Sequence, residues 1–463
     1  MSSNYAIIYR TLSKKKLFQK IASSQFLKTS FFVFVFLLLS KIVQFLKELV
    51  VAKEIGVTPM LDAYILALLF VTSLIVFVFQ PFAFAFIPIF IRLRKYSQDK
   101  ANMFFSKIVL IATILGIVGL GLQLCLVEQI LPLLASSFSE QYINLTKIFF
   151  LQLSPFYFFT VLSSLFGAYL NALNKNILYT IYPAFPALFV LLGFLFIPIE
   201  LPVYHLVYGF NIGSFVALCL LIWTCYRNGF YPCIIWRLDK ATKICLQQWV
   251  PLIFASFLMA VNPIIDKNMA ATLGAGSVSQ LEYGSKLFSI FSAFSITGLT
   301  TILFPYFSEK VAQKDYKGIL VFIKKTGSVL ILPLFLISVL VFLYAEYLVQ
   351  LVFERGAFTA EDTGVVADVM RFYIIGFPFL TFAIIGVRLV NSLQLNKLIV
   401  AFSLVNVSAN IILNWWFIEL YGLKGIALST SLIALIDVFL VWSAAYWFIK
   451  KRMKNKYETQ KSI

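Results

Sequence analysis

Charged side chains interrupt apolar segments at matching positions in two parts of the sequence. The first copy has Lys47-Glu48 followed by Gly56, and the second has Asp266-Lys267 followed by Gly274. In each copy the glycine comes eight residues after the acid. A lysine inside a membrane-spanning helix costs roughly 2.5–3.5 kcal/mol, so it normally faces a cavity or a partner. The repeated pattern therefore predicts a polar path lined with charges.

The repeat continues beyond these charges. An acid, a tyrosine and a proline follow in both copies, namely Asp62, Tyr64 and Pro88 in the first and Glu282, Tyr283 and Pro305 in the second. The pattern predicts that each proline closes a phenylalanine-rich helix and that basic turns follow at residues 92–95 and 310–317. A duplicated membrane unit around buried charges is typical of transporters built from two lobes.

Composition places the chain in the membrane. It is 61% hydrophobic and 13% charged, with 50 phenylalanines among 463 residues, which excludes a soluble globular class. About twelve apolar runs near 20 residues long are each able to cross ~30 Å of hydrocarbon as a helix. They lie at 27–46, 63–90, 105–127, 147–171, 177–198, 203–225, 247–269, 284–308, 326–352, 370–392, 398–418 and 425–449. The sequence therefore predicts an all-α membrane protein.

The formal net charge of +18 follows the loops rather than one surface. Lysines and arginines crowd the N-terminus, alternate loops and the C-terminal tail, whereas the intervening loops carry few bases and several acids. This alternation is the positive-inside pattern and predicts a multi-pass protein with both termini in the cytoplasm. Some of the bases also suit anionic lipid headgroups. A nucleic-acid partner is not expected.

Two six-helix lobes related by pseudo-twofold symmetry are the predicted architecture, because the repeated segments keep the same orientation. The predicted parts are a basic cytoplasmic N-terminus (1–26), an N-lobe (27–226), a cytoplasmic inter-lobe loop (227–244), a C-lobe (245–449) and a basic cytoplasmic tail (450–463). The space between two such lobes is the expected path of a polar substrate.

Several motifs resemble the MurJ (MviN) family of lipid II flippases. The segment 353–363, Phe-Glu-Arg-Gly-Ala-Phe-Thr-Ala-Glu-Asp-Thr, is similar to that family's loop between the ninth and tenth helices. Its first-helix pattern is similar to Ser40-Lys41, Lys47-Glu48, Gly56 and Asp62-Ala63-Tyr64. A later pattern of the family is similar to Asp266-Lys267, Gly274 and Leu303-Phe304-Pro305. The resemblance covers nearly the whole chain, and the family belongs to a superfamily that also holds O-antigen-type flippases and multidrug antiporters.

The resemblance implies a flippase, not an enzyme, in the bacterial cytoplasmic (inner) membrane. Its expected cargo is a polyprenyl-diphosphate-linked saccharide, lipid II first, moved from the inner to the outer leaflet by alternating access, with membrane lipids and the cell-wall synthesis machinery as further partners. Three departures keep another lipid-linked polysaccharide of the O-antigen type open as cargo. Lysines replace family arginines at 41, 47 and 267, apolar residues replace arginines in the second helix, and twelve spans are expected where the family usually has two more.

Four cations are the predicted ligands of the diphosphate: Lys41, Lys47, Lys267 and Arg388. Alternatives stay open for each of them. Lys47 could pair with Glu48 or Asp266, and Lys41 and Arg388 could reach toward the headgroups. The acids Glu48, Asp62 and Asp266 are predicted to gate the path by pairing with lysines in one state and releasing them in another; static ion pairs are the alternative.

A neutral oxygen site for a cation is the last predicted feature. Asn406, Asn410 and Asn414 form an i, i+4, i+8 stripe that Thr430 could complete, and Asp437 is a candidate protonation site. Interhelical hydrogen bonds are the alternative. Coupling to Na⁺, H⁺ or the membrane potential stays open.

No metal site or cofactor is predicted from the five cysteines and the single histidine. Three other functions compete with the flippase. A cation-coupled multidrug antiporter would need an acid-lined path, and a membrane enzyme would need a positioned carboxylate constellation. A scaffold that no longer transports is the third.

Overall fold

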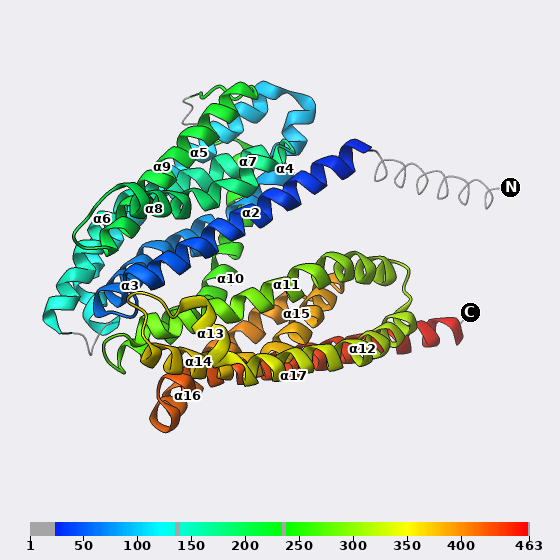
Figure 1. Ribbon diagram of the computed structural model, residues 1–463. Coiled ribbons are helices and arrows are strands. Elements are labelled where there is room, and N and C mark those ends of the chain that lie inside the picture. The colour runs from blue at the N-terminus through cyan, green and yellow to red at the C-terminus, as the bar shows by residue number, and fades with distance from the viewer. Residues whose placement is uncertain (1–23, 135–138, 234–237, 462–463) are drawn as a thin grey trace. The chain divides into compact units, whose positions relative to one another are not determined.

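The computed structural model describes residues 24–134, 139–233 and 238–461, and these form helices joined by short turns (Figure 1). In chain order the helices are α2 (Ser24–Glu54), α3 (Pro59–Leu74), α4 (Phe82–Tyr96), α5 (Gln98–Leu134), α6 (Glu140–Ala172), α7 (Asn176–Ile181), α8 (Phe185–Phe196), α9 (Val203–Arg227), α10 (Lys240–Ala271), α11 (Ser277–Ala312), α12 (Tyr316–Leu343), α13 (Ala345–Phe353), α14 (Ala360–Ile375), α15 (Phe377–Ser392), α16 (Asn396–Tyr421) and α17 (Leu423–Lys461). A π-helix, η1 (Ile75–Phe79), links α3 to α4, and a 3-10 helix, η2 (Tyr182–Ala184), links α7 to α8. The predicted basic N-terminus lies outside the described residues up to position 23.

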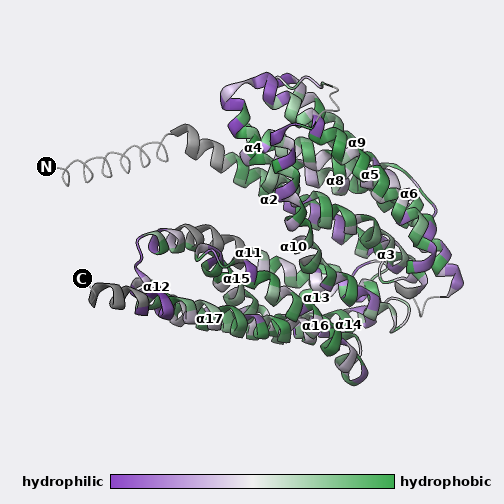
Figure 2. Ribbon diagram, turned by 180° about the vertical axis from the view of Figure 1, so that it is seen from behind, coloured by the Kyte–Doolittle hydropathy of each residue, from purple (hydrophilic) through white to green (hydrophobic). Residues whose placement is uncertain are grey.

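Each of the apolar runs predicted from the sequence falls mainly on one α-helix, or on two consecutive α-helices and any short helix between them. Within the described ranges, nine helices are long and apolar enough to cross a membrane, and a tenth is counted if α14 and α15, which meet at a bend of 42°, form one span. Green, hydrophobic residues run along most of these helices in Figure 2. The predicted all-α membrane fold is confirmed.

The two repeated prolines do not end their helices, so that prediction is wrong. Pro88 lies inside α4, and Pro305 lies inside α11. A proline removes one hydrogen bond from a helix, and within a membrane the surrounding helices keep the remaining backbone groups satisfied. Arg94 and Lys95 therefore lie in the last turn of α4 and Lys310 in that of α11, where a positive charge is favourable at the carboxyl end of the helix. Lys314 lies in the turn between α11 and α12, as predicted.

Contacts between residues divide the chain into two compact units, which are described separately. Unit 1 comprises residues 1–50, 82–118 and 154–249, and unit 2 comprises 51–81, 119–153 and 250–463. The boundaries cross α2, α5, α6 and α10 within their lengths. The lobes at 27–226 and 245–449 stay a prediction, and the two units cut across them.

Unit 1 is held together by aromatic rings and by one close helix crossing. The Phe105 ring centroid lies 4.7 Å from Tyr169 and 4.9 Å from Phe230. On α9, Gly209 and Gly213 face α8 so closely that a Cβ on either would lie 2.6 Å or less from α8 backbone atoms. Small residues four positions apart permit this approach between membrane helices.

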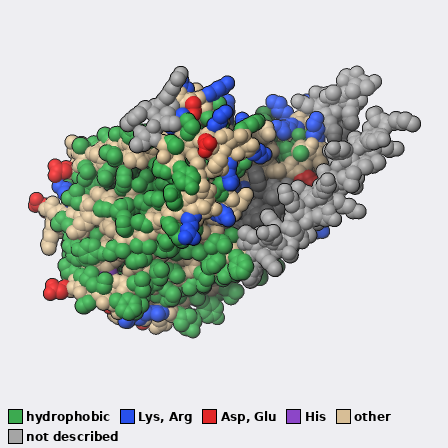
Figure 3. Space-filling model, turned by 90° about the horizontal axis from the view of Figure 1, so that it is seen from above, with side chains coloured by type: hydrophobic (Ala, Val, Ile, Leu, Met, Phe, Trp, Pro, Cys, Tyr) green, Lys and Arg blue, Asp and Glu red, His purple; other side chains and the backbone are tan. Residues whose placement is uncertain are grey.

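Unit 2 is built around α11, α14, α15 and α17. Its apolar core includes Leu303, Phe307, Leu389 and Val441, all nearly inaccessible to solvent. Outside such cores, many large apolar side chains remain exposed, and they cover much of the face shown in Figure 3. Exposed apolar surface on this scale matches a protein whose helices are solvated by lipid.

Candidate functional site

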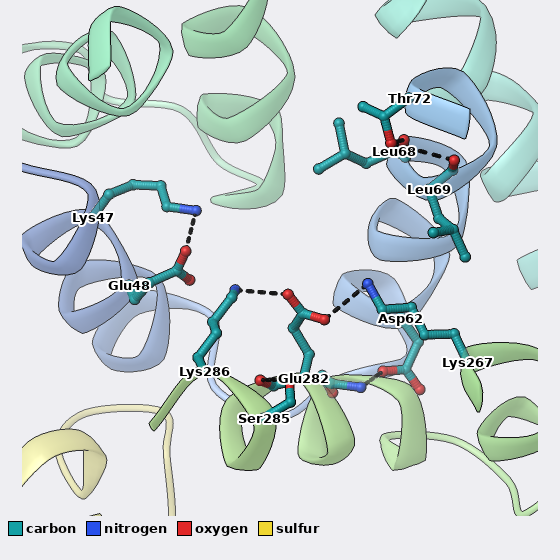
Figure 4. A network of polar contacts seen from close by, with 11 residues as sticks. Lys47, Glu48, Asp62, Leu68, Leu69, Thr72, Lys267, Glu282, Ser285 and Lys286 are labelled. Atoms are coloured by element: carbon teal, nitrogen blue, oxygen red, sulfur yellow. Dashed lines mark hydrogen bonds and ion pairs between the residues drawn. The ribbon is translucent and has the colours of Figure 1, made fainter. Parts of the chain in front are cut away.

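Three charged side chains of unit 2 form one partly buried cluster, the α10–α11 ion cluster, made of Lys267, Glu282 and Lys286. The Lys267 ammonium lies 2.8 Å from one Glu282 oxygen, and the Lys286 ammonium lies 3.3 Å from the other. Figure 4 shows the carboxylate between the two ammonium groups. The three side chains are only 19%, 21% and 29% exposed. The cluster therefore joins α10 to α11 through charge-assisted hydrogen bonds.

Asp266, the neighbour of Lys267, points to a different helix. Its Oδ1 accepts hydrogen bonds from the side-chain amides of Asn410, at 3.0 Å, and Asn414, at 2.7 Å. The Ser429 hydroxyl donates to the side-chain amide oxygen (Oδ1) of Asn414 and so links α17 to this group. Successive residues of a helix are about 100° apart around its axis. Asp266 and Lys267 therefore connect α10 to α16 and to α11, respectively.

Asp62 caps α11 from α3. Its side chain is fully buried and accepts hydrogen bonds from the backbone N–H of Gly276, at 2.6 Å, and of Ser279, at 2.7 Å. The α11 N-terminus has unpaired N–H groups and a partial positive charge, both of which suit a carboxylate. Asp62 thus bonds to the N-terminus of a helix, whereas its charge inside an apolar segment predicts a pair with a lysine.

The Arg-Gly-Ala-Phe-Thr loop at 355–359 packs on the turn after α2. The Ala357 N–H donates to the Lys53 carbonyl at 2.7 Å, and the Tyr283 hydroxyl donates to the Gly56 carbonyl at 3.3 Å. Gly56 has a φ of +64°, and a Cβ there would lie 2.3 Å from the Ala357 oxygen. Only glycine combines this left-handed backbone with such an approach. Elements from both sequence repeats therefore meet in one tight contact within unit 2.

Lys47 and Glu48 form an ion pair in unit 1. The Lys47 ammonium is 2.6 Å from the Glu48 carboxylate and 5.6 Å from the centre of the Phe210 ring. Their side chains are 13% and 15% exposed. Lys41, one turn and a half earlier on α2, is exposed. The local pair is one of the two partners that the sequence left open for Lys47.

The remaining predicted residues lie in separate places. Asn406 donates to Asp437 at 2.8 Å, so these two form a pair apart from Asn410 and Asn414. The Thr430 hydroxyl donates to the Ile426 carbonyl of its own helix. The Arg388 Nε is buried and has no hydrogen-bond partner among the described residues. Within those residues, no three His, Cys, Asp or Glu side chains group closely enough to hold a metal ion.

Three polar partners of the predicted site residues were not predicted as site residues from the sequence: Glu282, Lys286 and Ser429. The signal for two of them was present, because Glu282 belongs to the repeated pattern and Lys286 stands within a predicted span. The rule that an ionisable residue inside an apolar helix needs a partner applies to them as it does to Lys267. Ser429 has no comparable signal, since serines are common in membrane helices.

The segment between α9 and α10 is anchored on α5 within unit 1. The Lys107 ammonium, 6% exposed, lies 2.7 Å from Asp239. Asp239 also accepts from the Thr242 N–H at 2.8 Å and so caps α10. Burial raises the pKa of Asp239, but the hydrogen bonds from Lys107 and Thr242 outweigh that effect, so its pKa lies below the usual range.

Comparisons with known proteins agree with this fold. The profile of the family "Lipid II flippase MurJ" matches residues 51–462. Proteins named "Probable lipid II flippase MurJ" from Buchnera aphidicola subsp. Baizongia pistaciae and from Thermotoga maritima are each 26% identical to this chain. The first alignment covers 87% of this chain and 80% of the relative, and the second covers 90% and 84%.

Two solved structures have the same fold. "Lipid II flippase MurJ, inward closed conformation" has a TM-score of 0.78 and 22% identity, and the match covers 89% of this chain and 87% of that one. An inward-facing multidrug resistance MATE family transporter of the MOP superfamily also has a TM-score of 0.78, at 11% identity, with 90% and 96% covered. This chain therefore shares its fold with a lipid II flippase and with a multidrug transporter.

Proposed function

The chain belongs to the lipid II flippase MurJ family, and on this premise we propose that it moves a polyprenyl-diphosphate-linked saccharide, lipid II first, from the inner to the outer leaflet. It is a multi-pass membrane transporter and not an enzyme. The two predicted lobes would open alternately to either side, which is the usual mechanism of transporters with internal repeats. The prenyl tail would stay in the lipid while the polar headgroup crosses.

The α10–α11 ion cluster is the observation that carries this proposal. Two lysines from different helices meet at one carboxylate inside an apolar protein. Diphosphate oxygens accept hydrogen bonds from ammonium groups as carboxylate oxygens do. Lys267 and Lys286 are therefore the proposed diphosphate ligands in unit 2. We also propose that three further cations bind the diphosphate: Lys41, Lys47 and Arg388.

Asp62 and the 355–359 loop are the proposed gate. Their contacts lie at the ends of α2, α3, α11 and α13, which the positive-inside pattern assigns to the outer side of the membrane. Releasing Asp62 from the Gly276 and Ser279 N–H groups would free the α11 N-terminus to move. Glu48 and Asp266 remain proposed gating acids, each with the partner described above.

The carboxylate and amides at Asp266, Asn410 and Asn414 support coupling to Na⁺ or H⁺. Three oxygen-bearing side chains converge there from α10 and α16, and Asn414 also joins Ser429. Oxygen ligands of this kind suit hard cations. In this proposal the ion would bind Asp266 in place of the amide N–H groups. Thr430 and Asp437 would act beside it as further members of the predicted cation site.

The proposed location is the bacterial cytoplasmic membrane, with both termini in the cytoplasm. Apart from its lipid cargo, the proposed partners are membrane lipids and the cell-wall synthesis machinery. The alternation of basic and base-poor loops supports the orientation. Reporter fusions at the two termini, read for cytoplasmic or external activity, test it.

Depletion of this protein in its own host, followed by an assay of lipid II exposed on the outer leaflet, tests the function. The expected result is loss of exposed lipid II, its accumulation inside, and lysis. Normal exposure with loss of a surface polysaccharide would move the cargo to an O-antigen-type lipid. Efflux of cationic dyes without either change would instead indicate a multidrug antiporter.

A further inference from the structure

Glu282 occupies the place between the two lysines that the proposed function assigns to the cargo. Its two carboxylate oxygens are each taken by a different ammonium group, Lys267 on α10 and Lys286 one turn further along α11. Figure 4 shows these two ammonium groups on either side of the carboxylate. An anionic headgroup that binds these two ammonium groups has to compete with the Glu282 carboxylate for them, because each already directs one of its three N–H groups at it.

Charge counting shows how strongly Glu282 changes the site. Two lysines alone would present two positive charges, and Glu282 reduces the sum to one. Asp266, next to Lys267 and bonded to Asn410 and Asn414, brings the sum over these four side chains to zero. A phosphodiester lipid headgroup carries one negative charge, the same as the carboxylate it would displace. A diphosphate carries at least two, so it gains attraction on displacing Glu282 where a single phosphate does not.

Ordinary anionic phospholipids surround any membrane transporter in large excess over a specialised cargo. A bare pair of lysines would hold their headgroups as well. A binding site achieves specificity by penalising the wrong partner as well as by attracting the right one. Every anion that binds here has to break the same contacts between the Glu282 carboxylate and the two lysines. A more highly charged anion is attracted more strongly by the lysines and so offsets this free-energy cost.

We propose that Glu282 is a resident counter-ion that keeps singly charged phospholipids off Lys267 and Lys286 and yields only to a diphosphate. The inference rests on the proposed function, because it takes a lipid diphosphate as the cargo. Glu282 is thus a specificity-determining residue rather than a static link between α10 and α11.

Binding measurements on the full-length protein in phosphatidylcholine nanodiscs test the proposal. The probes are farnesyl diphosphate and dioctanoyl phosphatidylglycerol, titrated against wild type, Glu282→Gln and the control Glu309→Gln, which removes an exposed acid from the same helix. Wild type is expected to prefer the diphosphate. Glu282→Gln should bind phosphatidylglycerol about tenfold more tightly, the scale of one charge-assisted hydrogen bond, and lose much of that preference. The control should leave both affinities unchanged.

Other outcomes separate this inference from the proposed function. If Glu282→Gln weakens both probes or changes neither while wild type binds the diphosphate, Glu282 is a structural link and the inference fails. If wild type binds neither probe and Glu282→Gln binds phosphatidylglycerol, the exclusion role holds while the proposed cargo fails. Binding of neither probe by both proteins rejects both ideas. Should Glu282→Gln not fold, Glu282→Asp keeps the charge on a shorter side chain and is expected to give an intermediate preference.

Discussion

The two copies of the repeat satisfy their charges in opposite ways. In the first, the Lys47 ammonium lies 2.6 Å from its chain neighbour Glu48, so this ion pair joins two residues within one turn of α2. In the second, Asp266 and Lys267 turn away from each other, one to amides of α16 and the other to Glu282 of α11. Equivalent sequence positions thus give a local pair in unit 1 and a link among three helices in unit 2.

This difference shows what a repeat in sequence does and does not preserve. Both copies keep a base and an acid inside an apolar helix, but the order is reversed, so the side chains start from different faces of the helix. A local pair can move with its helix unchanged. A link among helices has to break or shift when those helices move, so the second copy is the better place to sense cargo and ions.

Exchanging charges in each copy tests this contrast and should give the largest effect. Lys47→Glu with Glu48→Lys keeps the pair but removes the Lys47 ammonium from the Phe210 ring, so it should cost about 1 kcal/mol, the scale of a cation–π contact. Lys267→Glu with Glu282→Lys places like charges beside Asp266 and Lys286, and should cost about 3–5 kcal/mol, the scale of a broken buried ion pair. Size-exclusion chromatography of heated, detergent-solubilised protein measures both. Equal melting of the two exchanges would remove the distinction between the copies.

Removing one cation tests whether the second copy binds the cargo. Lys267→Ala should lower transport about a hundredfold, which corresponds to losing a charged contact of about 2.7 kcal/mol, while membrane abundance stays the same because Lys286 still pairs with Glu282. Complementation of the depleted host, with immunoblots for abundance, measures this. Lys53→Ala removes an exposed lysine paired with Glu54 and serves as the control. Full complementation by Lys267→Ala would exclude Lys267 as a diphosphate ligand.

The sequence predicted the helices well because spanning length and hydrophobicity are properties of a single segment. It predicted partners poorly because partners depend on packing. Asn410 and Asn414 lie more than a hundred residues from Asp266, and nothing local marks their contact. For Asp62 the sequence predicts a lysine as partner, because charged side chains can be read from a sequence but the partial positive charge at a helix N-terminus cannot. The predicted helix ends at the two prolines are wrong for a related reason. A membrane helix continues through a proline that would end many helices of soluble proteins.

Replacing Asp62 tests whether its backbone contacts matter as much as a side-chain pair. Asp62→Asn keeps the shape but leaves one of the two N–H groups of Gly276 and Ser279 facing an amide donor. Stability should fall by about 2 kcal/mol, the usual cost of an unsatisfied buried group. Thermal unfolding measures this against Asp362→Asn, a similar change in an exposed capping box on α14. If both variants lose the same free energy of unfolding, the burial of Asp62 does not increase the stabilisation that its capping hydrogen bonds give.

The smallest expected effect concerns the anchor of the α9–α10 segment in unit 1. Asp239→Asn keeps a capping side chain for α10 but removes the negative charge that pairs with Lys107. Because Asp239 is partly exposed, the loss at neutral pH should be about 1 kcal/mol. The pKa of Asp239 is lowered in the folded protein, so this stability is present above the unfolded-state pKa and disappears as the pH falls through the folded-state value. Melting curves of the two proteins should therefore differ at pH 7 and begin to converge as the pH falls below about 4, the unfolded-state pKa of aspartate. A difference that persists unchanged at pH 3 would show that the Asn side chain, rather than the lost ion pair, causes the destabilisation.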